Sequence, residues 1–268
     1  MLLEFTKMQG VGNDYIYVDA RKQTIHDPNQ LAVKLSDRHF GVGGDGLVLI
    51  LPPTEFGADV TMAMYNADGS EGLMCGNAVR CVAQWLIEQG EVRGNVVRIA
   101  TKSGIKRVRR LRANYFSVDM GMATIGDVQL FGIKDLTTVD IGNPHVVWFP
   151  QFEIVNYDIK RLGRRIEHSK VFPHGTNVEF VRVVGENLLQ MRVWERGSGE
   201  TLGCGTGACA AAVASVARGF CNREKLIRVQ LPGGELAVDC SGEHVRLLGP
   251  AVTVFRGIVE MEGEKDEN

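Results

Sequence analysis

The chain has 268 residues, of which 44% are hydrophobic, so it is long enough to bury one large core or two of ordinary size. Its 30 basic and 32 acidic residues give a formal net charge of -2, which excludes a strong overall attraction to nucleic acid or to an anionic membrane. This balance favours a small neutral or zwitterionic ligand.

The first half of the chain is predicted to be rich in strands, because apolar and β-branched residues alternate through it. The first strand lies in MLLEFTKMQG, where Glu4 and Lys7 interrupt what would be the apolar region of a secretory signal, so no export signal is predicted. Helices are predicted at 28–37 and 76–89. The strands of this half are predicted at 2–8, 15–20, 47–51, 59–65, 96–101, 104–111 and 115–119.

The second half has the same character, with one helix predicted at 157–167 and one at 205–218. Its apolar runs, such as ACAAAVASVA, are shorter than the roughly 20 residues that a membrane span needs. A soluble, cytoplasmic protein is therefore expected. The strands of this half are predicted at 145–149, 178–184, 188–195, 226–231, 235–240, 244–248 and 252–260.

The two halves repeat each other in sequence. A displacement of 129 residues brings YNADGSEGLMCG, 65–76, onto WERGSGETLGCG, 194–205, and brings Cys75 onto Cys204. Upstream, GNDYIYV at 12–18 resembles GNPHVVW at 142–148. A parallel over some sixty residues before each cysteine indicates duplication.

We therefore predict two similar domains, 1–119 and 120–268, related by a pseudo-twofold axis and facing each other. The last strand, near 252–260, is a candidate to pack back on the first domain.

Each repeated cysteine is predicted to stand at the start of a helix. The positive end of the helix dipole is expected to lower the pKa of such a thiol from about 8.5 toward neutrality. The first backbone N–H groups of a helix are also free to bind an anion such as a carboxylate. These groups belong to Gly76, Asn77, Gly205 and Thr206.

Two thiols on facing domains predict a specific reaction at a carbon acid that bears a carboxylate. One thiolate removes a proton from one face, and a thiol on the other face returns one. A single base would return the proton to the same face, whereas two bases allow inversion. The helix ends would stabilise the developing negative charge. The constellation therefore predicts a racemase or an epimerase.

The chain resembles the diaminopimelate epimerase family along essentially its whole length. The resemblance is carried by FTKMQGVGNDY at 5–15, YNADGSE, MCGNAVRC, GNPH, GTNVEF, WERGSGETLGCGTGA and GPAVTVFRG at 249–257. It implies an α+β fold of two domains, each a mainly antiparallel sheet curled around a central helix, with the active site in the cleft between them. It also implies cofactor-independent interconversion of LL- and meso-diaminopimelate, in the biosynthesis of lysine and of peptidoglycan precursors.

The resemblance assigns a role to each matched residue. Cys75 and Cys204 match the pair that acts as thiolate base and thiol acid, with the roles exchanged when the reaction reverses. The backbone cradle of the reacting carboxylate matches Gly76, Asn77, Gly205 and Thr206. The remaining substrate contacts match Asn13, Asn66, Asn143, Asn177, Glu195 and Arg196.

Chemistry supports these distal contacts, because the far end of diaminopimelate is itself a zwitterion. Arg196 can bind its carboxylate through two hydrogen bonds, and asparagine amide oxygens can accept from its ammonium. His145 and Glu195 match positions that influence the pKa values of the cysteines.

Two positions depart from the family. Gly46 stands where some relatives carry a glutamine that lines the pocket, and Phe255 stands where some carry a tyrosine associated with dimer contacts. The pattern remains compatible with a homodimer.

Other readings of the same residues remain open. A buried structural thiol explains either repeated cysteine alone, and Cys81, Cys209, Cys221 and Cys240 are expected as core or surface residues. The cysteines are too sparse for a disulfide scaffold and lack CxxC spacing, and the six histidines do not cluster, so no metal centre is predicted.

Four alternative functions compete with epimerisation of diaminopimelate. A racemase of the same fold could act on proline, hydroxyproline, histidine or another amino acid. GCGTGA at 203–208 precedes a predicted helix and suggests a nicotinamide-dependent oxidoreductase, but MCGNAV in the other copy lacks that glycine spacing. A cysteine-nucleophile hydrolase and a non-catalytic amino-acid-binding protein are the others.

Overall fold

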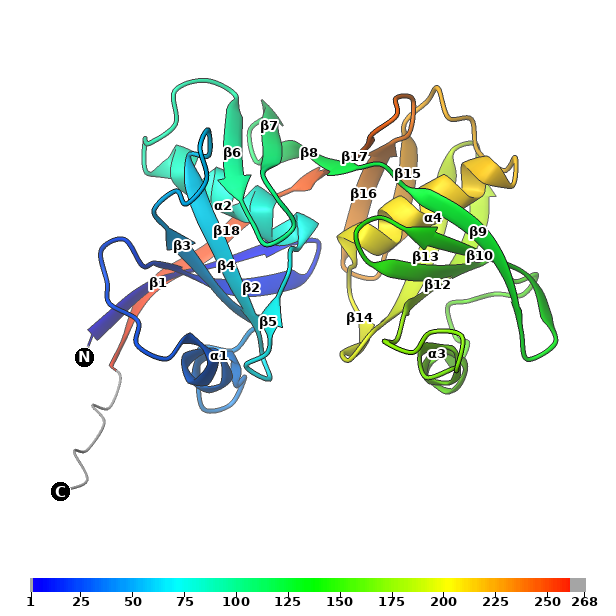
Figure 1. Cartoon of the computed structure of the whole chain (residues 1–268), viewed down its shortest axis with the longest axis horizontal. Helices are drawn as coiled ribbons and strands as arrows, with labels where there is room; N and C mark the ends of the chain where they lie inside the picture. The colour runs from blue at the N-terminus through cyan, green and yellow to red at the C-terminus, as the bar shows by residue number, and fades with distance from the viewer. Residues whose placement is uncertain (1, 261–268) are drawn as a thin grey trace.

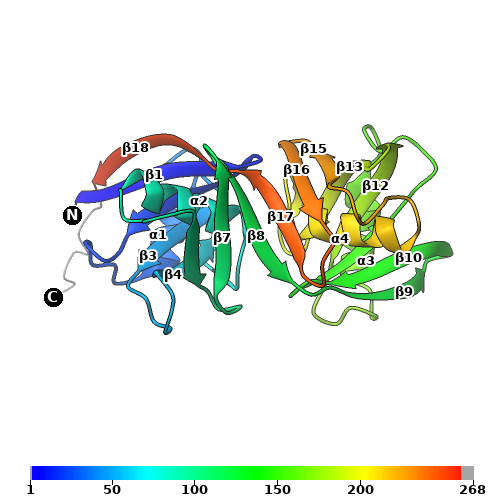
Figure 2. The same ribbon diagram turned by 90° about the horizontal axis from the view of Figure 1, so that it is seen from above.

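The structure is a computed structural model that describes residues 2–260. Residue 1 and residues 261–268, the outer ends of the two predicted domains, lie outside this part of the chain. Two lobes of curled sheet lie side by side, each around one long helix (Figures 1 and 2). These central helices are α2 (Gly76–Glu88) and α4 (Gly205–Ala217). The predicted α+β fold with two similar halves is confirmed.

The first lobe is built on strands that run mainly antiparallel. The exceptions are β2 with β3 and β4 with β6, which pair in parallel. Helix α1 (Pro28–Ser36) joins β2 to β3, and α2 lies between β5 and β6. The strands are β1 (Leu2–Gly10), β2 (Asn13–Asp19), β3 (Gly46–Leu51), β4 (Val60–Asn66), β5 (Glu71–Gly72), β6 (Val96–Ala100), β7 (Lys106–Arg112) and β8 (Tyr115–Gly121).

The second lobe repeats this topology. Its parallel pairs are β11 with β12 and β13 with β15, and helix α3 (Ile159–Glu167) joins β11 to β12 as α1 joins β2 to β3. The strands are β10 (Ile133–Asp140), β11 (Pro144–Trp148), β12 (Asn177–Gly185), β13 (Leu188–Glu195), β14 (Gly199–Thr201), β15 (Ile227–Leu231), β16 (Gly234–Asp239) and β17 (Val245–Pro250).

The lobes exchange strands with each other. β8 pairs with β17 between the lobes, and after each of these strands the chain crosses over (Figure 2). β9 (Thr124–Leu130) then pairs with β10 in the second lobe, and β18 (Val252–Glu260) pairs with β1 in the first. The predicted boundary between residues 119 and 120 lies within β8 and stays a prediction.

The central helices are buried because their sequences are apolar or small on nearly every side. In α4 the run Ala208–Ala212 is fully buried, and it belongs to one hydrophobic cluster with residues of α2 such as Val79 and Val82. The outer helices α1 and α3 cover the sheets from outside and form their own small clusters, around Leu31 and around Ile166. The shared cluster fixes the two helix starts relative to each other.

None of the helices described between residues 2 and 260 is both long and apolar enough to cross a membrane.

Candidate active site

Cys75 and Cys204 occupy the same place in the two lobes. Each is the N-cap of its central helix and has an extended backbone, with φ/ψ of -133°/123° at Cys75 and -116°/116° at Cys204. Because an N-cap residue precedes the free N–H groups of the first turn, each thiol lies beside a potential anion site.

The N-terminal ends of α2 and α4 lie close together at the interface between the two lobes, here called the seam. A Cβ atom on Gly205 would lie 3.4 Å from Asn77 Oδ1. A Cβ atom on Gly76 or Gly205 would lie 2.8 or 2.9 Å from the same Cδ2 atom of Leu247. The absence of side chains at these two glycines therefore lets the helix starts approach each other.

The thiol of Cys75 faces an amide oxygen. Its Sγ donates to Asn13 Oδ1 at 3.3 Å, and Asn77 Nδ2 donates to the same oxygen at 3.4 Å. On the other side, Asn13 Nδ2 donates to Asp45 Oδ2 at 3.0 Å. Asp45 thus fixes which end of the amide faces the thiol. Asp45 was not predicted as a site residue from the sequence. The feature that could have indicated it is the presence of an acidic residue within the glycine-rich stretch GVGGDG.

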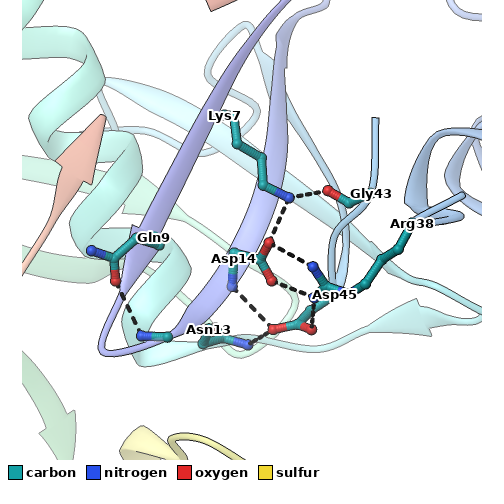
Figure 3. Close-up of polar contacts among 8 residues, drawn as sticks. Lys7, Gln9, Asn13, Asp14, Arg38, Gly43 and Asp45 are labelled. Carbon is teal, nitrogen blue, oxygen red and sulfur yellow. Dashed lines mark hydrogen bonds and ion pairs between the residues drawn. The ribbon is translucent and has the colours of Figure 1, made fainter. Parts of the chain in front are cut away.

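A charged network surrounds Asp14 and Asp45, the neighbours of this asparagine (Figure 3). Lys7 Nζ lies 2.7 Å from Asp14 Oδ2, and Arg38 Nη2 lies 2.7 Å from Asp14 Oδ1 and 3.1 Å from Asp45 Oδ1. Although burial opposes the effect, hydrogen bonds from Arg38 and Lys7 lower the pKa of Asp14. Burial raises the pKa of Asp45. The network holds the hairpin between β1 and β2 in place.

Gly46 is the structural counterpart of Asn177. Gly46 pairs with Tyr15 in the parallel ladder of the first lobe, as Asn177 pairs with His145 in the second. A Cβ atom on Gly46 would lie 2.1 Å from the carbonyl oxygen of Tyr65. The backbone of this chain therefore excludes the glutamine that some relatives carry at this position.

The thiol of Cys204 lies among different groups. The backbone N–H of Gly207 donates to its Sγ at 3.3 Å, and Thr206 Oγ1 lies 3.5 Å from the sulfur. Asn143 Nδ2 donates to Thr206 Oγ1 at 3.3 Å. In both lobes, therefore, the asparagine of the hairpin contacts the second residue of the central helix.

A fully buried pair lies behind Asn143. His145 Nδ1 is 2.7 Å from Glu179 Oε1, and His145 Nε2 is 3.1 Å from Asn143 Oδ1. Both ring nitrogens of His145 are therefore engaged, one by Glu179 and one by Asn143. Glu179 was also missed by sequence reasoning, although a carboxylate within the apolar strand NVEFV is an available signal.

The remaining predicted residues make local contacts in the loops beside the two thiols. Asn177 Oδ1 accepts from the backbone N–H of Arg196 at 2.9 Å, which places the loop after β13. The Thr201 hydroxyl donates to Glu195, and Glu195 contacts Cys204. The Asn66 amide donates to Ser70 in its own turn at 3.0 Å.

A cavity of about 300 Å³ opens between the lobes. Three of the predicted residues line it, namely Asn143, Arg196 and Thr206. The first lobe and the strands that cross between lobes contribute Leu73, Met74, Ser103, Lys106, Met120 and Met122, and the loop before β11 contributes Ile141 and Gly142. Both halves therefore contribute to one small site.

The pKa values of the two thiols do not follow the sequence prediction. Burial raises the pKa of Cys75, although N–H groups of Ala78 and Asn77 oppose this. Burial, followed by the charges of Glu195 and Glu179, raises the pKa of Cys204 well above its usual value. The predicted lowering was wrong in direction, because desolvation of a thiolate outweighs the helix N–H groups here.

The arrangement suits proton transfer. Two thiols at the starts of facing helices can hold and exchange protons beside N–H groups that bind a carboxylate. All six cysteines are free thiols. Between residues 2 and 260, no three His, Cys, Asp or Glu side chains are grouped so that they could hold a metal ion.

Comparison with known proteins gives concordant matches along the chain. The model of a family described as diaminopimelate epimerase matches residues 5–126 and 137–257. A diaminopimelate epimerase of Desulfovibrio desulfuricans is 46% identical, over 95% of this chain and 97% of the relative. One of Acetivibrio thermocellus is 42% identical, over 97% of this chain and 99% of the relative.

Solved structures share the fold at low sequence identity. A phenazine biosynthesis protein of Bacillus anthracis has a TM-score of 0.76 at 16% identity, covering 97% of this chain and 100% of that one. A hydroxyproline epimerase of Agrobacterium vitis has a TM-score of 0.67 at 15% identity, covering 96% and 91%. At such identities the likeness concerns the fold alone.

Proposed function

The chain belongs to the diaminopimelate epimerase family, and from this premise we propose the role of each residue in its cleft. It is an isomerase that interconverts LL- and meso-diaminopimelate in lysine biosynthesis. One observation supports the assignment of the catalytic pair more than any other: Cys75 and Cys204 cap two helices whose starts meet at the seam between the lobes.

Cys75 and Cys204 transfer the proton on opposite faces of the reacting carbon. One sulfur, as thiolate, takes the α-proton, and the electron pair of the broken C–H bond moves toward the carboxylate. The other sulfur, as thiol, gives its proton to the opposite face. The protein ends with the two protonation states exchanged, which prepares it for the reverse reaction. The two thiols thus supply both transfers without a cofactor.

The negative charge that develops on the substrate carboxylate is stabilised by the helix starts. The N–H groups of Gly76, Asn77, Gly205 and Thr206 are the proposed donors. They gain most when the charge is largest, so their contribution favours the transition state over the bound substrate.

The distal zwitterion of the substrate binds to polar groups at the cleft. Arg196 lines the cavity and is proposed to bind the distal carboxylate. The proposed partners of the distal ammonium and of the substrate backbone are Asn13, Asn66, Asn143, Asn177 and Glu195. His145, through Asn143 and Thr206, and Glu195, directly, tune the pKa of Cys204.

We also propose a homodimer formed through the edge strand β18, in a cytoplasmic protein. Val254, Phe255 and Ile258 leave 54%, 46% and 62% of their surface exposed on this strand. Phe255 stacks edge to face on Phe5 of β1, with 5.8 Å between the ring centroids. An exposed apolar edge strand suits pairing with a second copy. Sedimentation equilibrium should give a dimer that Phe255→Asp weakens; a wild-type monomer would contradict the proposal.

The decisive experiment is incubation of the protein with LL-diaminopimelate in deuterium oxide, with no cofactor added. We expect the meso form to appear and deuterium to enter the α-position. A racemase of the same fold would instead leave diaminopimelate unchanged and racemise proline, hydroxyproline or histidine offered in parallel. Absence of exchange with all of these substrates would contradict an epimerase.

A further inference from the structure

Arg80 is a fully buried cation, and among residues 2–260 it forms no ion pair with a carboxylate. It lies five residues after Cys75, and it leaves no surface exposed. Its hydrogen bonds go to three neutral oxygens: Asn77 Oδ1 at 2.7 Å, Gly76 O at 3.1 Å and Pro250 O at 3.2 Å. Burial lowers the pKa of Arg80, and the largest opposing effects come from the thiols of Cys81, Cys75 and Cys209 and from Tyr17. Such a charge is unfavourable unless something compensates it.

The backbone is shaped around this guanidinium from both lobes. A Cβ atom on Gly10 of β1 would lie 3.2 Å from Arg80 Nη2, and one on Gly249 of β17 would lie 3.0 Å from it. Side chains at these two glycines would therefore crowd the charge. The internal repeat brings Arg80 onto Cys209, so α4 has no equivalent cation. A single arginine, at the start of α2, therefore contacts backbone from both lobes.

Arg80 orients the side-chain amide of Asn77. This amide begins a series of hydrogen bonds that leads through Asn13 to Cys75. Because Asn77 Oδ1 accepts from Arg80, Asn77 Nδ2 points the other way, toward Asn13 Oδ1. That oxygen accepts from the thiol of Cys75. Asn13 is also held from its other end by Asp45. Arg80 and Asp45 thus fix the amides of Asn77 and Asn13 from opposite ends.

The negative charge that would compensate the guanidinium of Arg80 develops during the reaction. In the proposed mechanism the thiolate of Cys75 and the substrate carboxylate both carry negative charge at the start of α2, where Gly76 and Asn77 accept hydrogen bonds from the guanidinium. We propose that Arg80 is a positioning residue that orients the Asn77 amide and serves as the buried counter-cation for negative charge at Cys75. This inference rests on the proposed role of Cys75. The charge of Arg80 lowers the pKa of Cys75, against the larger effect of burial.

The test is the pH dependence of alkylation of Cys75 by iodoacetamide, with the modified peptide identified by mass spectrometry. In Arg80→Met we expect the midpoint to move up by about one pH unit. Arg80→Gln keeps donors for Asn77 without the charge and should show the same shift. Arg80→Lys keeps the charge and should leave the midpoint near that of the wild type, with a lower kcat/KM because Asn77 is less well held.

The matched control is Arg192→Met, which removes an arginine that also binds backbone oxygens, those of Ile154 and Tyr157, pairs with Glu200 and is not among the residues described as lining the cavity. It should lower stability without moving the midpoint of Cys75. If Arg80→Met does not fold, the comparison of Arg80→Gln with Arg80→Lys decides. A midpoint equal in these two variants and the wild type would overturn the proposal. Lack of epimerisation by the wild type would instead refute the proposed function, because alkylation is measured without substrate.

Discussion

At the scale of single residues, the two thiols must be equally essential, because inversion needs a base and an acid on opposite faces. Cys75→Ala and Cys204→Ala should each reduce epimerisation by about 10²–10⁴-fold or more. Cys209→Ala is the control, because Cys209 is fully buried within α4 and lies outside the proposed pair. It should stay active and lose about 1 kcal/mol of stability. The activity of all three variants is measured as formation of meso-diaminopimelate from the LL form. A fully active Cys75→Ala or Cys204→Ala variant would refute the two-base mechanism.

The direction of the thiol pKa shifts predicts how activity depends on pH. The base must be a thiolate, and burial raises the pKa of Cys75, so kcat/KM should rise with pH, tenfold per unit, below that pKa. Burial and the nearby carboxylates raise the pKa of Cys204 further, so it remains the thiol acid to higher pH. The fall of kcat/KM should therefore come at still more alkaline pH. A rate profile that decreases from about pH 7 upward would contradict this order.

The identities of the site residues could be predicted from the sequence more accurately than the pKa shifts of their side chains. The sequence repeat aligns Cys75 with Cys204, and in the structure both are N-cap residues of the central helices. The pKa shifts could not be predicted, since they depend on burial that only the packed lobes create. Asp45 and Glu179 were not predicted from the sequence for a related reason. Asp45 holds Asn13 and Glu179 holds His145, partners that are distant in the sequence, and no local motif encodes such a contact.

At the scale of elements, every helix was predicted because each has a clear periodic or apolar pattern, while β9 and β10 were missed. The turn between these two strands is Phe131–Gly132, and both residues have positive φ, 56° and 77°. A hairpin of this kind normally shows Asn-Gly or Asp-Gly. Phenylalanine at the first position therefore hides the hairpin. β5 and β14, of two and three residues, are too short to show alternation.

The start of α4 gives a prediction about an element. A Cβ atom on Gly207 would lie 2.7 Å from Glu179 Oε1 and 3.3 Å from Cys204 Sγ. Glu179 cannot simply move away, because it holds His145. Gly207→Ala should therefore displace Cys204 and lower kcat by more than tenfold, and destabilise the fold by about 1–3 kcal/mol.

The control for this substitution is Gly185→Ala at the end of β12, where the nearest atom would lie at an ordinary 3.5 Å. It should leave kcat and stability near wild type. Steady-state kinetics and urea unfolding measure both variants. Equal kcat values for Gly207→Ala and Gly185→Ala would show that the space at the helix start is not needed.

At the scale of the whole molecule, duplication has produced two lobes that cannot separate. Each lobe completes its sheet with a strand that follows the other lobe in sequence, β18 in the first and β9 in the second. The central helices share one hydrophobic cluster, and Arg80 of α2 binds the carbonyl of Pro250, the last residue of β17. A site that needs one thiol from each lobe benefits from this, because the strand exchange limits how far the two helix starts can move apart.

The same interlocking predicts that the two lobes unfold together. Trp85 lies in α2 of the first lobe, and Trp148 and Trp194 lie in β11 and β13 of the second. In Trp85→Phe, fluorescence reports only the second lobe. In the double variant Trp148→Phe, Trp194→Phe it reports only the first. For each variant, the urea midpoint by fluorescence should equal its own midpoint by circular dichroism, because one lobe cannot lose its sheet without releasing a strand of the other. A fluorescence midpoint well separated from the circular dichroism midpoint in either variant would mean that the lobes fold independently, and that the exchanged strands and the shared core couple them only weakly.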